Sequence, residues 1–213
     1  MNNTEVLKRD GLGSILLVPH RQTVIRNAAD AMFGARWLAR ILVRREIRAL
    51  RQTQHIAGIP DLIWFDKDRV ARRYLDGNAM HLSQFEASTF FPNAFALLRR
   101  MHRSGVAHND LAKEANWVCM PANQAGIVDF QLALCSRRRG KLFRVLARED
   151  LRHLLKHKRH YALSSLTARE RAILAQPSVL AKIWQYCVKP PYLFFTRRLL
   201  GWQNRNSAIE RQH

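Results

Sequence analysis

Three oxygen-bearing side chains near the middle of the chain have the types and spacing needed to bind a divalent cation and a phosphate ester. Asp110 and Asn116 lie on one polar loop, and Asp129 directly follows the apolar pair Ile127 and Val128, which predicts a short buried strand. Carboxylate and amide oxygens are ligands that suit Mg²⁺. Phosphoryl transfer needs such ligands, a carboxylate that orients the attacking hydroxyl, and a cation on the phosphates. These residues therefore indicate phosphoryl transfer.

The same region carries two sequence motifs. Residues 101–111 read MHRSGVAHNDL, and residues 128–131 read VDFQ. The first resembles L-H-x-x-G-x-x-H-R-D-L, the approach to the catalytic loop in the protein-kinase superfamily, and the second stands where D-F-G is expected. The resemblance implies ATP and Mg²⁺ as cofactors, Asp110 as the catalytic base, and Asn116 and Asp129 as the metal ligands.

The resemblance covers about residues 5–160 and implies further site residues. Lys113, which follows Asp110 on the loop, would neutralise the transferred phosphate. Arg26 precedes Glu46 by 20 residues, close to the family's separation between the strand lysine that holds the nucleotide phosphates and its helix glutamate. Glu46 falls on the apolar side of a predicted helix, a costly position unless a cation meets it. Arg26 and Glu46 are therefore expected to act in one site.

Other segments complete the nucleotide site that the resemblance implies. Tyr74 and Leu75 resemble the hinge between two lobes, where adenine hydrogen-bonds to the backbone. Gly11 and Gly13 would form an abbreviated loop over the phosphates, and a plain β-turn is the alternative. Asp150 would anchor the catalytic loop from the following helix, and a surface carboxylate is the alternative.

The chain departs from the family pattern at several positions. Arg26 replaces the strand lysine, and a planar guanidinium differs from an ammonium in reach and donor geometry. Asn109 replaces the Arg of H-R-D, and Gln131 replaces the Gly of D-F-G, which disfavours a mobile flip of that segment. Asp110 and Asn116 are separated by five residues rather than the family's four. Arg26, Asn109 and Gln131 favour the alternative of a nucleotide-binding pseudokinase or regulatory scaffold.

The region after Asp129 differs from that of kinases that act on peptides. It contains no A-P-E-like segment, and Ser136 is the only hydroxyl side chain between Asp129 and Asp150. An activation loop switched by phosphorylation is therefore not expected. The basic run at residues 137–141 looks more like compact atypical relatives, namely RIO-type kinases and the bacterial kinases that phosphorylate Kdo or heptose sugars of lipopolysaccharide. The expected acceptor is a hydroxyl of a lipopolysaccharide-type sugar or of a protein Ser/Thr.

Hydrophobic periodicity predicts the elements that position these residues. Alternation predicts strands at residues 5–8, 14–18 and 23–26, and a hairpin at 62–65 and 70–75. Helical spacing predicts helices at 35–54, at 91–101 with a stop at Gly105, at 142–160 and at 167–188. With the resemblance, this order predicts an α+β protein of reduced protein-kinase-like bilobal fold. The expected parts are a sheet-rich nucleotide-binding lobe at 1–77, a helical catalytic lobe at 78–202 and a polar tail at 203–213.

Charge points to phosphate-rich partners. The 213 residues include 36 Lys and Arg against 16 Asp and Glu, a formal charge of +20. Besides ATP, the expected partner is an anionic acceptor or membrane surface, reached through the basic segment 136–160 and the aromatic and arginine-rich segment 189–202. The alternative for segment 136–160 is a solvated helix, and the alternative for segment 189–202 is a C-terminal helix packed on its own lobe.

Two further expectations rest on what the sequence lacks. Without a zinc pattern or an aromatic RNA-binding signature, a basic nucleic-acid-binding protein is only the third reading. Three scattered cysteines and no apolar signal core or bilayer-length apolar stretch predict a cytoplasmic protein, with a peripheral place at the inner membrane face as a further option. The sequence does not indicate an oligomeric state.

Overall fold

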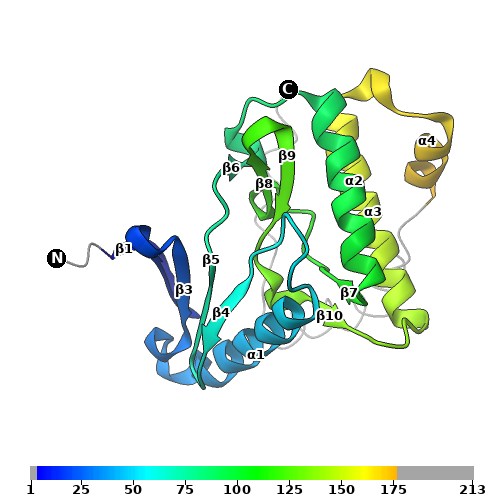
Figure 1. The fold of residues 1–213 in the computed structure, drawn as a ribbon. Coiled ribbons are helices and arrows are strands. Elements are labelled where there is room, and N and C mark those ends of the chain that lie inside the picture. Colours follow the sequence, from blue (N-terminus) through cyan, green and yellow to red (C-terminus); the bar gives the residue numbers. More distant parts are fainter. Residues whose placement is uncertain (1–3, 177–213) are drawn as a thin grey trace, which may run out of the picture. The chain divides into compact units, whose positions relative to one another are not determined.

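The N-terminal part of the chain forms a five-stranded antiparallel sheet with the strand order β1-β2-β3-β5-β4 (Figure 1). Its strands are β1 (Glu5–Asp10), β2 (Gly13–Val18), β3 (Thr23–Asn27), β4 (Leu62–Phe65) and β5 (Arg69–Arg73). All five were predicted within a few residues. β5 ends before the predicted Leu75. The N–H of Tyr74 still donates to the carbonyl of Gln22 in the β3–β5 register, at 2.7 Å, but the N–H of Gln22 donates to the carbonyl of Pro19 instead of to β5.

The turn between β1 and β2 depends on one glycine. Gly13 has a φ of +122°, and a Cβ at this position would lie 2.2 Å from the carbonyl oxygen of Asn27 on β3. Only glycine allows both this backbone conformation and this close approach. The fold therefore requires glycine at position 13 independently of the predicted role of Gly13 in covering nucleotide phosphates.

Helix α1 (Arg36–Gln52) packs against the sheet and against the turn Phe130–Leu132. Its buried apolar residues Ala39, Val43, Ile47 and Leu50 recur at helical spacing and form one face. Glu46 lies on this buried face, as predicted.

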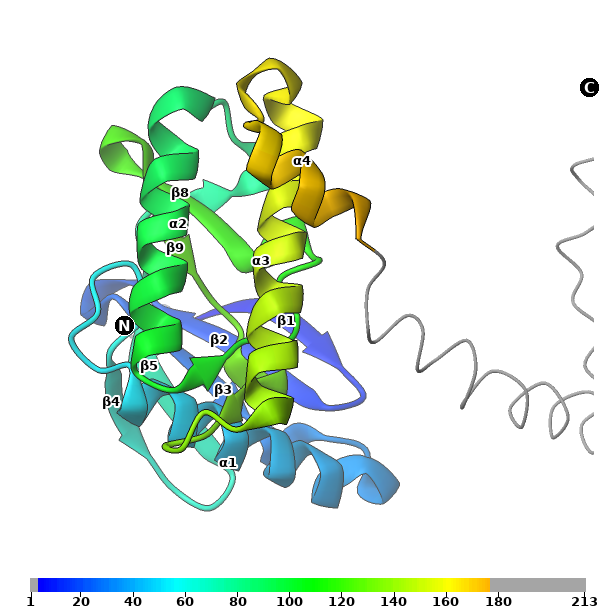
Figure 2. The same ribbon diagram turned by 90° about the vertical axis from the view of Figure 1, so that its right-hand side faces the viewer.

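The C-terminal part is mainly helical. Helix α2 (Ala87–Arg103) and helix α3 (Lys141–Tyr161) lie side by side, and α4 (Ala168–Ala175) follows (Figure 2). Two small antiparallel sheets lie beside them: one contains β6 (Asn78–Ala79), β8 (Trp117–Met120) and β9 (Gln124–Ile127), and the other contains β7 (Val106–Ala107) and β10 (Leu134–Cys135). Apart from the end of β9, these strands were not predicted, since two to four residues are too few to show a period.

The computed structural model describes residues 4–176. The chain divides into two units, Met1–Leu174 and Ala175–His213, so the predictions for 189–202 and 203–213 and most of the predicted helix 167–188 lie outside the described residues. The first unit has an antiparallel sheet followed by a helical region, which confirms the predicted bilobal α+β fold. No helix within residues 4–176 has the length and apolar character to cross a membrane.

Candidate active site

The predicted catalytic loop is anchored by Asp150 on α3. Its two carboxylate oxygens accept hydrogen bonds from the backbone N–H groups of His108 and Asn109, both at 2.8 Å, and Oδ2 lies 3.1 Å from Nε2 of His102. Asp150 is 0% exposed, so the alternative of a surface carboxylate is wrong. Asn109 itself has a φ of +63°, a left-handed conformation that asparagine tolerates better than most residues.

This anchor leads to a prediction of stability. Asp150→Asn keeps one acceptor oxygen but places an NH₂ group against a backbone N–H, which should cost about 1.5–3 kcal/mol of unfolding free energy. Urea denaturation measures the change, with Asp76→Asn as a control because Asp76 is exposed. A variant as stable as the control would show that the two backbone hydrogen bonds contribute nothing.

His108 joins the loop to the segment before Asp129. Its Nε2 lies 2.9 Å from the carbonyl oxygen of Val128, so this nitrogen must carry the proton and donate. Its ring stands at an edge-on angle to the buried Phe130, with centroids 4.8 Å apart. Burial lowers the pKa of His108, which keeps the imidazole neutral at pH 7. The side chain therefore has a structural role.

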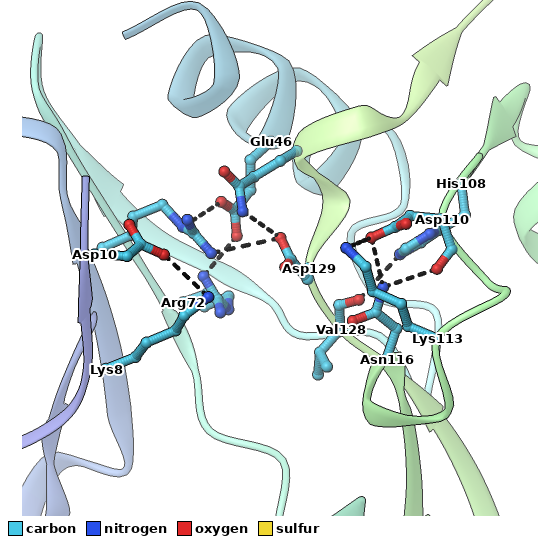
Figure 3. A network of polar contacts seen from close by, with 12 residues as sticks. Lys8, Asp10, Glu46, Arg72, His108, Asp110, Lys113, Asn116, Val128 and Asp129 are labelled. Carbon is cyan, nitrogen blue, oxygen red and sulfur yellow. Dashed lines mark hydrogen bonds and ion pairs between the residues drawn. The ribbon is translucent and has the colours of Figure 1, made fainter. Parts of the chain in front are cut away.

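The loop brings Asp110, Lys113 and Asn116 together (Figure 3). Oδ2 of Asp110 accepts hydrogen bonds from Nζ of Lys113 at 2.7 Å and from Nδ2 of Asn116 at 3.0 Å. Nδ2 of Asn116 also donates to the carbonyl oxygen of Asp110 at 2.8 Å. The loop ends in a 3-10 turn at Glu114–Asn116. The Asp110 hydrogen bond raises the pKa of Lys113, which therefore stays charged.

The end of this loop is held by α3. Nε2 of His157 lies 2.9 Å from the carbonyl oxygen of Leu111, and the hydroxyl of Tyr161 donates to Oε2 of Glu114 at 2.8 Å. Burial and the Glu114 carboxylate raise the pKa of Tyr161 to about 12, so its hydroxyl keeps its proton. Both ends of the loop are thus bound to one helix.

Asp129 lies opposite the loop and adopts a left-handed conformation, with φ 68° and ψ 68°. Its Oδ1 accepts a hydrogen bond from Nε2 of Gln131 at 2.6 Å and from Nη2 of Arg26 at 3.4 Å. Burial pushes the pKa of Asp129 upward, but the charge of Arg26 and the Gln131 hydrogen bond outweigh it and hold the pKa below its usual value. Asp129 is therefore an ionised carboxylate at neutral pH.

A chain of ion pairs connects Asp129 to the sheet and to α1. Nε of Arg26 lies 3.2 Å from Oε2 of Glu46, in an ion pair without hydrogen-bond geometry. Nη1 of Arg72 donates to Oε1 of Glu46 at 2.5 Å, and Glu46 is 0% exposed. Ion pairs therefore run from Arg72 on β5 through Glu46 on α1 and Arg26 on β3 to Asp129 in the predicted metal segment. Figure 3 labels Arg72, Glu46 and Asp129.

Two members of this network were not predicted. Arg72 could have been recognised, because strand alternation places it on the same side as the buried Val70. Gln131 was noted only as a departure from the family pattern, and its local sequence carries no signal for the hydrogen bond to Asp129.

The other predicted residues lie outside the polar network. The carbonyl of Gly11 accepts a hydrogen bond from the N–H of Met32 at 3.1 Å, and Gly13 packs on β3. Tyr74 and Leu75 connect β5 to β6, and Leu75 packs toward Gly126 on β9. Their roles in nucleotide binding stay predictions.

The donor set fits Mg²⁺. Asn116 turns its NH₂ group to Asp110, which leaves its Oδ1 without a hydrogen-bond donor among residues 4–176. Within the same residues, no three His, Cys, Asp or Glu side chains gather into a metal-binding group. Asn116 and Asp129 offer one amide oxygen and one carboxylate, and Mg²⁺ is usually bound by one or two carboxylates plus substrate phosphates.

Solved structures share this fold. The Rio2 kinase from Chaetomium thermophilum matches with a TM-score of 0.59 and 12% identity, over 82% of this chain and 61% of that chain. The Rio2 kinase-ADP/Mg²⁺-phosphoaspartate complex from the same organism matches with a TM-score of 0.56 and 12% identity, over 88% of this chain and 64% of that one.

These matches establish the class of fold. The chain has the protein-kinase-like fold, as the sequence resemblance predicted, and it spans somewhat less than two thirds of the length of these structures. No protein-family model and no curated protein sequence matches the chain.

Proposed function

We propose that this protein is an ATP- and Mg²⁺-dependent kinase that transfers the γ-phosphoryl group to a hydroxyl acceptor. The observation that carries the proposal is the meeting of Asp110, Lys113 and Asn116 on an anchored loop, facing an ionised Asp129. The kinase-like fold and the neighbour solved with ADP and Mg²⁺ support it.

The chain's own residues would divide the work as follows. Oδ2 of Asp110 is occupied by Lys113 and Asn116, so Oδ1 is the oxygen left to accept the proton of the attacking hydroxyl. As Asp110 becomes neutral, the ammonium of Lys113 is released toward the transferred phosphate. Mg²⁺, held by Asn116 and Asp129, would neutralise phosphate charge.

The N-terminal lobe would bind the nucleotide. The backbone N–H of Tyr74 is already paired with Gln22, whereas the backbone of Leu75 makes no hydrogen bond with another backbone group of residues 4–176. Leu75 is therefore the better candidate of the predicted hinge pair for adenine. Arg26 would meet the phosphates from β3, fixed in position by Glu46 and Asp129. Gly11 and Gly13 would cover the phosphates from the β1–β2 turn.

Two classes of hydroxyl compound are candidate acceptors. The basic segment at residues 137–141 favours a lipopolysaccharide-type sugar, because phosphorylated sugars are anionic. A protein Ser/Thr is the other candidate. A pseudokinase is the second candidate function, favoured by the engagement of Arg26 with two carboxylates.

Asp110→Asn tests the proposed function. We expect Mg²⁺-dependent ATP turnover by the wild-type protein, and a loss of at least about 10²-fold in the variant because the general base is removed. ATP affinity should change little, since Asp110 does not hold the nucleotide. Turnover is measured with lipopolysaccharide core or a protein acceptor, with EDTA as the metal control.

A control variant at another carboxylate separates the loss of the catalytic base from the loss of one negative charge. Asp61→Asn removes the same charge from the N-terminal lobe and should keep wild-type turnover. ATP binding without turnover in the wild-type protein would support the pseudokinase. Absence of both ATP binding and turnover would overturn both functions.

A further inference from the structure

Helix α1 presents an outer face that has no part in the candidate active site. Successive helical residues rotate by about 100° around the helix axis, so positions 37, 41, 44, 48 and 51 form one stripe opposite Glu46. The stripe contains Trp37, Ile41, Arg44, Arg48 and Arg51. All five side chains are exposed. The stripe is therefore available to a partner.

The N-terminal end of the stripe is apolar. Phe33 in the turn before α1 is 94% exposed and Trp37 is 64% exposed, with Met32 and Ile41 also exposed beside them in sequence. Single exposed apolar residues are normal, but a contiguous group of large ones marks an interaction site. The four exposed apolar side chains lie close together in sequence, which makes this end of the helix a candidate contact surface.

The C-terminal end of the stripe is cationic and opens into a cavity of about 720 Å³. Arg44, Arg48 and Arg51 line it from α1, Lys67 from the β4–β5 turn, and Arg137 from the segment after β10. Within residues 4–176, none of these five cations lies within 4 Å of a carboxylate oxygen.

The remaining walls of the cavity leave its lining with a net positive charge. Its acidic lining residue, Asp66, is engaged by Arg69 at 2.7 Å. Its apolar walls include Ile47 and Phe65, and the guanidinium of Arg51 lies 4.3 Å from the Phe65 ring centroid. A concave, low-dielectric site with one sign of charge concentrates anions.

We infer that the α1 docking face, formed by Phe33, Trp37, Ile41, Arg44, Arg48 and Arg51, binds an anionic membrane surface. Lipid phosphate groups would enter the cationic cavity while the apolar end enters the interfacial region, where Trp and Phe are favoured. Single-stranded nucleic acid fits less well, because stacking uses aromatic rings and gives the exposed aliphatic side chains Met32 and Ile41 no role. A free phosphate would leave the apolar end uncovered.

Vesicle co-sedimentation without nucleotide tests this inference independently of the proposed kinase activity. The wild-type protein should bind vesicles of phosphatidylglycerol and phosphatidylcholine, and bind phosphatidylcholine alone weakly. The variant Arg44→Gln/Arg48→Gln/Arg51→Gln should bind the anionic vesicles about tenfold more weakly or worse. These side chains are exposed, so a circular dichroism spectrum should show an unchanged fold.

Matched charge removal elsewhere is the control. Arg9→Gln/Arg21→Gln/Arg99→Gln removes the same charge from three exposed sites and should stay within about threefold of wild type. Equal losses in both triple variants would show that overall charge alone explains the binding, which would overturn the inference.

The apolar end separates a membrane from soluble anions. Phe33→Ser/Trp37→Ser should weaken binding to anionic vesicles severalfold and leave binding of inositol hexakisphosphate unchanged. If this variant binds vesicles like wild type while the arginine variant loses inositol hexakisphosphate, the cavity binds a soluble phosphate instead. The inference of membrane binding would also be overturned if the wild-type protein bound no vesicles and the arginine variant lost binding to RNA.

Discussion

Asp129→Asn is expected to lower Mg²⁺-dependent ATP turnover by roughly 10³-fold or more. The variant replaces an ionised carboxylate by a neutral amide at the position proposed to hold the metal. Its backbone should not be strained, because asparagine accepts the φ of 68° that Asp129 adopts. The loss of turnover would therefore report the lost charge rather than a lost fold.

Magnesium titration gives this variant a second readout. If Asp129 binds the metal, the Mg²⁺ concentration needed for half-maximal turnover should rise in Asp129→Asn, and the remaining activity should increase at high Mg²⁺. Asp61→Asn is again the matched control, with the same chemical change at an exposed ion pair with Arg73. An unchanged Mg²⁺ dependence would remove Asp129 from the proposed metal site.

Glu46→Ala is expected to destabilise the protein by about 3–5 kcal/mol, because it removes the buried carboxylate that pairs with both Arg26 and Arg72. Glu46 is 0% exposed and lies against Arg26 and Arg72, which are themselves buried. Glu46→Gln keeps the shape and one acceptor oxygen, so its loss of stability should be smaller. Both variants should also reduce ATP turnover, since Arg26 loses one of the two carboxylates that position it.

Urea unfolding with Glu5→Ala as the control measures this effect. Glu5 is exposed on β1, so its removal should change the unfolding free energy by less than about 0.5 kcal/mol. A Glu46→Ala variant as stable as Glu5→Ala would mean that the buried arginines find water or other partners. The interpretation of Glu46 as the centre of the ion-pair chain would then be wrong.

The local patterns predicted most of the elements and several parts of the site. Apolar residues at helical spacing indicated α1, and Asp110, Lys113 and Asn116 lie on one short loop, where chain connectivity already brings them close. Glu46 on an apolar face required a cation, and the structure provides two. These predictions succeeded because periodicity and short loops are properties of neighbouring residues.

Contacts between distant residues were decided only by the tertiary structure. Arg72 on β5 reaches Glu46 on α1, and Arg26 on β3 reaches Asp129, which lies 103 residues further along the chain. Lys67 and Arg137 meet the arginines of α1 in one cavity although each lies on a different segment.

There is a physical reason why some features follow from the sequence and others only from the tertiary structure. By itself, the sequence determined the α+β order, the acid and amide oxygens of the proposed chemistry and the large positive charge, since these are properties of residue types and of their spacing along the chain. Which cation neutralises Glu46, and where the unpaired arginines gather, depends on how the sheet, α1 and the loops pack. Packing joins residues that no local pattern relates.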